Sequence, residues 1–113
     1  MAFCPSSSRA VVIEVKSTTK DSWIVGGHVP PPADKPWVFV HVSVEPSHPP
    51  RYYVLIQREL HDILTPIDTT YRENYRTKHG RDFDGAGVVT LRLKDAELHA
   101  NKWDKIIALV NAV

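Results

Sequence analysis

The sequence predicts a single α/β domain in which helices pack on a mixed β-sheet. Runs of β-branched and aromatic residues, which favour strands, occur at residues 36–44, 51–56 and 88–93. Apolar residues recur at helical spacing within residues 57–64 and 95–110. A chain of 113 residues, of which 42% are hydrophobic, can bury one core but is too short for a second domain.

The N-terminal residues predict a leader followed by a strand. We assign residues 1–113 to the domain and expect residues 1–9 to form a flexible leader, because they are small and polar. Residues 10–16 (AVVIEVK) are rich in β-branched residues and predict the first strand. Side chains alternate along a strand, so one face is expected to carry Val11, Ile13 and Val15, and the other Val12, Glu14 and Lys16.

The middle of the chain alternates strand patterns with turn-forming residues. Residues 22–25 (SWIV) predict a short strand, and a pair of glycines ends it. The prolines at 30–32 cannot lie inside a helix, because they lack amide donors and their rings clash with the preceding turn. Residues 36–44 and 51–56 then predict neighbouring strands of a meander joined by a proline-containing loop.

Two helices are predicted after this meander. Residues 57–64 place apolar side chains on one helical face, and we expect Pro66 to end that helix. Residues 69–79 predict a second helix, with Thr70 as its N-terminal cap and Gly80 as its stop.

The C-terminal part predicts a final strand and a final helix. Residues 88–93 (VVTLRL) have the composition of a strand. Residues 95–110 predict a helix that packs on the sheet through one apolar stripe, formed by Trp103, Ile106, Ile107 and Val110.

The charge balance limits the classes of partner. Lys and Arg total 14 against 13 Asp and Glu, so the net charge of +1 gives no global attraction to a phosphate backbone. Any affinity for nucleic acid must therefore come from a local patch. Tyrosines and basic residues interleave in one segment, which predicts contacts to DNA phosphates and bases from Arg72, Arg76, Lys78 and Arg81. The alternative is a solvated helix face.

Cysteine content and hydropathy indicate a cytoplasmic protein without membrane contact. The lone cysteine, Cys4, cannot form an internal disulfide, and the N-terminus lacks a secretory pattern. The longest apolar run, residues 38–44, is interrupted by polar residues and falls far short of the ~20 residues that span a bilayer. The histidines show neither zinc-binding helix spacing nor partner cysteines.

The pair Glu14 and Lys16 is the candidate catalytic pair. Residues two apart on a strand share a face and lie roughly 7 Å apart, so both can address one ligand. A carboxylate such as Glu14, with the carbonyl of Val15, can hold a divalent cation, while Lys16 can orient water or stabilise charge on a phosphate. In this hypothesis Val15 also anchors the strand in the core. The alternative is a surface ion pair worth about 0.2 to 1 kcal/mol.

An ordered set of short motifs accompanies this pair. Glu-Val-Lys-Ser-Thr at 14–18 is followed by Ser22-Trp23, by WVFV at 37–40, by YYV at 52–54 leading into a helix, and by KWD at 102–104. This order resembles an uncharacterised subgroup of the PD-(D/E)XK nuclease-like superfamily over residues 11–109. The resemblance implies a restriction-endonuclease-like core and Mg²⁺- or Mn²⁺-dependent DNA cleavage, with Glu14 and Lys16 at the E and K of the signature.

The chain departs from this family in one respect. The signature includes an acidic residue on the preceding strand, whereas residues 1–13 contain no Asp or Glu. The resemblance therefore implies that the N-terminal helix and acidic strand are missing, through a misplaced start, a truncation, or completion of the domain by a partner chain. One carboxylate holds a hard cation weakly, because such ions need several oxygen ligands, so we expect little catalysis from the isolated chain.

Two functions from different classes follow. One is a nuclease-fold protein acting on DNA through Glu14 and Lys16. The other is a non-catalytic protein-binding or regulatory module that forms a homodimer through the sheet edge left open by the missing strand.

Overall fold

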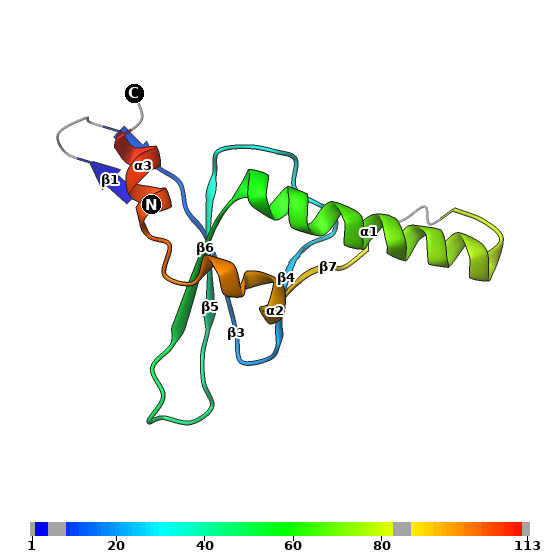
Figure 1. The fold of residues 1–113 in the computed structure, drawn as a ribbon, viewed down its shortest axis with the longest axis horizontal. Coiled ribbons are helices and arrows are strands. Elements are labelled where there is room, and N and C mark those ends of the chain that lie inside the picture. The colour runs from blue at the N-terminus through cyan, green and yellow to red at the C-terminus, as the bar shows by residue number, and fades with distance from the viewer. Residues whose placement is uncertain (1, 5–8, 83–86, 112–113) are drawn as a thin grey trace.

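The computed structural model describes residues 2–4, 9–82 and 87–111 of the chain (Figure 1). It contains a small N-terminal hairpin, a central sheet, a second two-stranded sheet and a long helix. The elements in chain order are β1 (Ala2–Cys4), β2 (Arg9–Val11), β3 (Glu14–Thr18), β4 (Ser22–Gly26), β5 (Pro36–His41), β6 (Arg51–Ile56), α1 (Gln57–His79), β7 (Val89–Arg92), α2 (Leu93–Ala96), the 3₁₀-helix η1 (Glu97–His99) and α3 (Asp104–Asn111).

The central sheet has the strand order β3-β5-β6. Strand β5 pairs with β3 in parallel and with β6 antiparallel, so the sheet is mixed. Strands β4 and β7 form a separate antiparallel pair, and β1 pairs with β2. The mixed sheet with helices confirms the predicted α/β class, and the strands predicted at 22–25, 51–56 and 88–93 lie within one residue of β4, β6 and β7.

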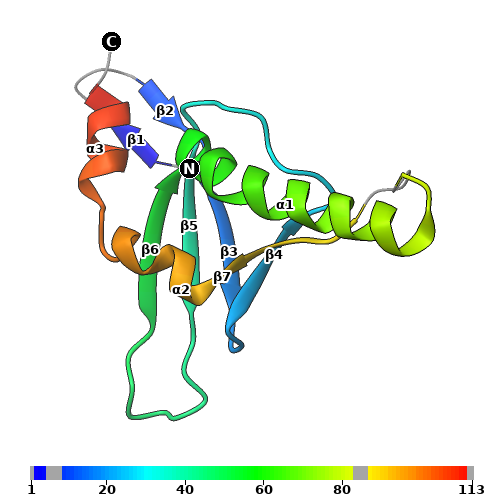
Figure 2. The same cartoon turned by 45° about the vertical axis from the view of Figure 1, so that its right-hand side comes forward.

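The main core lies between α1 and one face of the central sheet (Figure 2). Phe39 and Leu55 on this face, and Leu60 of α1, have no exposed surface. Trp23 of β4 closes the core and packs edge-on against Phe39 at a centroid distance of 5.4 Å. Its indole Nε1 donates to the carbonyl of Val40 at 2.9 Å, which fixes β4 over the sheet.

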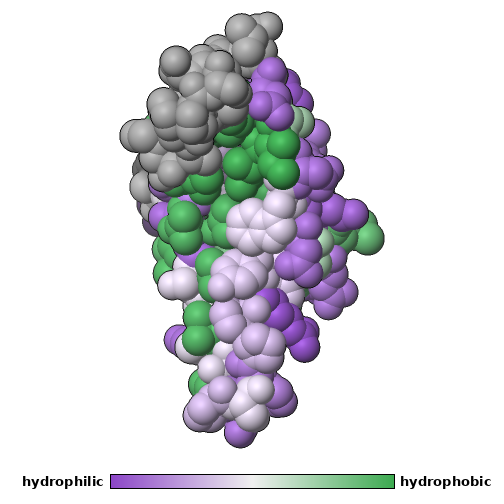
Figure 3. All heavy atoms as spheres, turned by 90° about the vertical axis from the view of Figure 1, so that its left-hand side faces the viewer, coloured by the Kyte–Doolittle hydropathy of each residue, from purple (hydrophilic) through white to green (hydrophobic). Residues whose placement is uncertain are grey.

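A smaller core lies on the opposite face of the sheet. Val38 of β5 and Val54 of β6 are buried there beneath Ile106 of α3. Because α3 contacts β1, β2 and β6, it covers the β6 side of this face and leaves the β3 side exposed. Figure 3 shows the molecule from the end where α3 lies. On this surface, apolar residues (green) are exposed between polar residues (purple).

The strand predicted at residues 10–16 is divided in the structure. Residues 9–11 form β2, which pairs with β1, whereas residues 14–18 form β3, which pairs with β5. The two halves have different partners, so the chain leaves the strand conformation at residues 12 and 13. Strands β1 and β2 also include backbone from the segment expected to be a flexible leader, of which residues 1 and 5–8 lie outside the described residues.

Helix α1 corrects the prediction of two helices. It runs without interruption from Gln57 to His79 and contains Pro66. A proline removes the hydrogen bond to the carbonyl four residues earlier, here that of Asp62. Both residues are exposed, so water can satisfy that carbonyl. Thr70 is therefore helix interior, whereas Gly80 ends the helix as predicted, with φ 69° and its N–H bonded to the Arg76 carbonyl at 2.8 Å.

The C-terminal helix predicted at 95–110 is also divided, into α2, η1 and α3. Ala100 forms a β-bridge with Tyr53, and the Asn101 N–H donates to the Tyr52 carbonyl at 2.9 Å. This extended stretch against β6 breaks the helix. Of the predicted stripe, Ile106 is buried, whereas Trp103 is 40% and Ile107 is 60% exposed.

Candidate functional site

Strand β3 carries the predicted catalytic pair. The register places Glu14 beside Trp37 and Lys16 beside Phe39, so both side chains lie on the α1 face of the sheet. Both are half-buried, and the Lys16 ammonium lies 6.0 Å from the centroid of the Trp37 ring. The shared face agrees with the predicted strand geometry. The roles of Glu14 and Lys16 as metal ligand and base stay predictions.

Val15 corrects one part of the sequence analysis. Its side chain is 60% exposed and does not anchor the strand in the core. The reason is that it points to the α3 face of the sheet, next to Val38, at the edge that α3 does not reach. The core contacts of β3 come instead from the opposite face, where Glu14, Lys16 and Thr18 are half-buried.

Glu14 and Lys16 were also predicted to form a metal-dependent site. Glu14 and Lys16 form no ion pair with each other or with another described residue. Within residues 2–4, 9–82 and 87–111, no three His, Cys, Asp or Glu side chains lie close enough to share a metal ion. The Mg²⁺ or Mn²⁺ site predicted at Glu14 and the Val15 carbonyl stays a prediction.

The backbone of β3 forms an open edge. Among the described residues β3 pairs with β5 alone. The Val42 N–H donates to the Thr18 carbonyl at 2.9 Å, so the polar groups of Thr18 point toward β5. Because these groups alternate along a strand, those of Val15 and Ser17 point away from β5. Strand β4 follows after a tight turn but diverges from β3 toward its Glu14 end (Figure 2).

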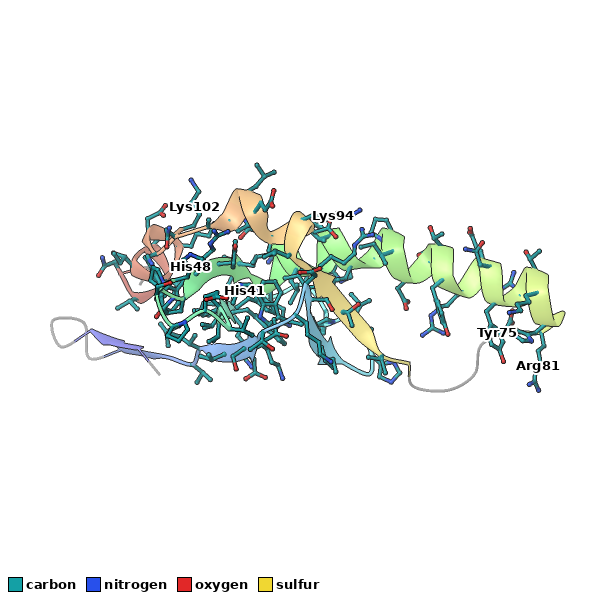
Figure 4. The ribbon with its side chains drawn as sticks, turned by 90° about the horizontal axis from the view of Figure 1, so that it is seen from below. His41, His48, Tyr75, Arg81, Lys94 and Lys102 are labelled. Carbon is teal, nitrogen blue, oxygen red and sulfur yellow. The ribbon has the colours of Figure 1, made fainter. Side chains whose placement is uncertain are left out.

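The predicted nucleic-acid contacts lie elsewhere. Arg72, Arg76, Lys78 and Arg81 lie on or just after the distal half of α1, which projects beyond the sheet, away from β3 (Figures 1 and 4). Arg72 pairs with Asp68 at 2.9 Å and Arg76 with Asp82 at 2.6 Å. Cations near a helix C-terminus are also favoured by the helix dipole. Part of this positive charge is therefore already engaged within the chain.

A polar cluster that the sequence analysis did not identify joins the C-terminal segment to α1. The Lys105 ammonium donates to the Val54 carbonyl at 3.0 Å, to the Glu59 carboxylate at 3.0 and 3.1 Å, and to Nδ1 of His99 at 2.8 Å. Glu59 also accepts a hydrogen bond from the Ile56 N–H at 2.9 Å, which satisfies one free donor at the start of α1. Glu59 at the third position of a helix was the available signal.

The pKa values of Glu59 and His99 in this cluster are both lowered. Burial raises the pKa of Glu59, but the hydrogen bonds from Ile56 and Lys105 outweigh it, so the net pKa lies below 4.5. Burial and the Lys105 charge lower the pKa of His99 below 6.5. Because the Lys105 ammonium can only donate, Nδ1 of His99 accepts in this contact, which places the ring proton on Nε2. We infer that this cluster has a structural role and holds η1 and α3 against the rest of the fold.

A groove of about 430 Å³ lies between α1 and the start of β7. Leu64, Ile67 and Tyr71 line its helix side, and Val88 and Val89 line its strand side. It lies on α1, apart from Glu14 and Lys16. Helix α1 is the longest helix among the described residues, and none of these helices is apolar enough over its length to cross a membrane.

Comparison with known proteins adds no family assignment. No protein-family model matches the chain, and no curated protein matches it significantly.

Proposed function

We propose that the chain is a non-catalytic protein-binding module that accepts an extended partner strand along the outer edge of β3. The observation that carries the proposal is the open edge, where the N–H and C=O groups of Val15 and Ser17 point away from β5. An unpaired edge of this kind is a template for a further strand, because its hydrogen-bonding groups have a fixed spacing and direction.

The neighbouring side chains support this proposal. Val15 presents a largely exposed apolar side chain on the α3 face, and Glu14 and Lys16 present opposite charges on the α1 face. An added strand with alternating residues would contact both kinds, one on each face. Main-chain hydrogen bonds would supply affinity, and these side chains would supply selectivity.

Short peptides with alternating apolar and polar residues test the proposal. Fluorescence polarisation is measured with labelled peptides and with the same peptides N-methylated at alternate amides. The chain is compared with Val15→Pro, which removes an outward N–H, and with Val15→Thr, which keeps it. Proline is tolerated on an edge strand where its nitrogen faces solvent, and circular dichroism checks the fold.

We expect unmethylated peptides to bind the chain and Val15→Thr, and not Val15→Pro. If the N-methylated peptides bind as well as their parents, or if Val15→Pro binds as well as Val15→Thr, the β3 edge is not the binding site and the proposal is wrong.

A second candidate function is a metal-dependent DNA phosphodiesterase on a truncated restriction-endonuclease-like core, acting in the cytoplasm. Glu14 and Lys16 favour it, because they share one face of β3 and are not neutralised by an ion pair with any described residue. Arg72, Arg76, Lys78 and Arg81 are the proposed DNA contacts. A site of this kind needs further oxygen ligands for Mg²⁺, which a partner strand along β3 would have to bring.

Plasmid cleavage in a Mg²⁺ or Mn²⁺ titration tests this candidate. The chain is compared with Glu14→Gln, which removes the charge of the carboxylate at similar size, and with Glu45→Gln, an exposed control outside the site. Metal-dependent cleavage lost only in Glu14→Gln supports the phosphodiesterase. Equal cleavage by all three proteins would remove it.

A further inference from the structure

We infer that the strand bound by the β3 edge is β3 of a second copy of this chain, in an antiparallel register centred on Val15. This inference rests on the proposed function, since it names the partner of the same edge. It makes the chain a symmetric dimer with one continuous sheet formed from both central sheets.

The direction of the backbone groups limits the registers. In an antiparallel pair, opposite residues either exchange two hydrogen bonds or exchange none, in alternation. The outward groups of β3 belong to Val15 and Ser17, so hydrogen-bonded pairs must join these odd-numbered positions. With Val15 opposite the partner's Val15, the central bonded pair uses outward groups of both copies, and Ser17 faces the partner's Ile13, just before β3.

The charges on the α1 face select among these registers. Centring on Val15 places Glu14 opposite the partner's Lys16, and Lys16 opposite the partner's Glu14. Centring on Lys16 instead places the two lysines opposite each other, and centring on Ser17 places Lys16 opposite the partner's Thr18. Directly opposite residues interact strongly, favourably for unlike charges and unfavourably for like charges. The Val15 register alone pairs both charges of both copies.

The other face of the sheet fits the same register. Val15 is 60% exposed in the single chain, and in the dimer it lies beside the partner's Val15. Burial of this apolar pair adds to the hydrogen bonds and the ion pairs. The dimer also engages Glu14 and Lys16 in ion pairs, so a divalent cation bound by Glu14 would compete with the dimer.

Charge reversal tests the inference, with oligomeric state measured by sedimentation velocity over a range of protein concentrations. Glu14→Lys opposes two lysines at both ends of the pairing, and Lys16→Glu opposes two glutamates. We expect each variant to weaken dimerisation by about tenfold or more. An equimolar mixture of the two variants restores unlike pairs, so we expect it to form a heterodimer with affinity close to that of the unmodified chain.

Hydrogen exchange of backbone amides provides a second measurement that needs no substitution. The Lys16 amide is bonded to β5 in the single chain, whereas the Val15 amide points outward. We therefore expect protection of the Val15 amide to rise with protein concentration and protection of the Lys16 amide to stay constant.

The outcomes separate this inference from the proposed function. A chain that stays monomeric but binds alternating peptides in the manner described above would overturn the dimer and leave the binding module intact. A dimer that is insensitive to both charge reversals, or variants that do not recover as a mixture, would place the dimer contact elsewhere. A monomer that binds no peptide would remove both.

Discussion

Replacement of Lys105 by methionine should destabilise the fold, because this side chain ties α3 to β6, α1 and η1. Lys105 donates to the Val54 carbonyl at 3.0 Å and to Nδ1 of His99 at 2.8 Å, and it pairs with Glu59. Methionine keeps the apolar stem of the side chain and removes every one of these contacts.

The size of the effect follows from the burial of each contact. A net contribution of about 1 kcal/mol is expected for each of the hydrogen bonds to Val54 and His99. The pair with Glu59 adds about 0.5 kcal/mol, because a surface-type pair is screened by solvent and this carboxylate is 36% exposed. Lys105→Met should therefore lower the free energy of unfolding by about 2.5 kcal/mol.

Urea unfolding followed by circular dichroism measures this free energy. Lys102→Met is the matched control, because Lys102 is an exposed lysine on the same segment whose side chain has no hydrogen bond or ion pair with another described residue. A surface substitution of this type changes stability by less than about 0.5 kcal/mol. If the two variants unfold at the same urea concentration with the same slope, the cluster around Lys105 does not hold the C-terminal segment in place.

Three further predictions concern pH and α1. The pKa of His99 is lowered in the folded chain, chiefly by burial, so the unfolded chain takes up a proton first as the pH falls below 6.5. The free energy of unfolding should have its full value above pH 6.5 and fall as the pH drops toward the folded pKa. His99→Gln should reduce this fall when urea unfolding is measured at a series of pH values. An unchanged dependence on pH would show that His99 is not the group responsible. Gly80→Ala should cost about 1 kcal/mol through its left-handed backbone alone, since an added Cβ meets no atom within 4 Å; urea unfolding without a loss would show that the residue is not left-handed. Pro66→Ala should stabilise α1 by about 1 to 3 kcal/mol, because it restores the hydrogen bond to Asp62, and unfolding at lower urea would contradict this.

Local sequence patterns were sufficient to predict strand β6 and the end of helix α1. Residues 51–56 were predicted as a strand and form β6. Successive apolar side chains of this strand point alternately into the main core and into the smaller core. Gly80 was predicted as a helix stop and is one, since its left-handed backbone is a local property of glycine.

The pattern failed at Pro66 and in the C-terminal helix. Pro66 was expected to end a helix, but α1 continues through it, because the proline and Asp62, whose carbonyl loses its partner, are both exposed to water. The C-terminal helix was expected to be continuous, but Ala100 bridges to Tyr53 and divides it. Local propensity gives no information on this bridge, because it joins residues far apart in the chain.

For the candidate site, the sequence by itself determined that Glu14 and Lys16 share one face of a strand, because side chains alternate with a period of two residues. The tertiary structure decided that Val15 is exposed, that β3 lies at an edge of the sheet, and that Lys105 meets Glu59 and His99. The physical reason is that strand order and helix placement are set by burial of apolar surface over the whole chain, which no short segment encodes.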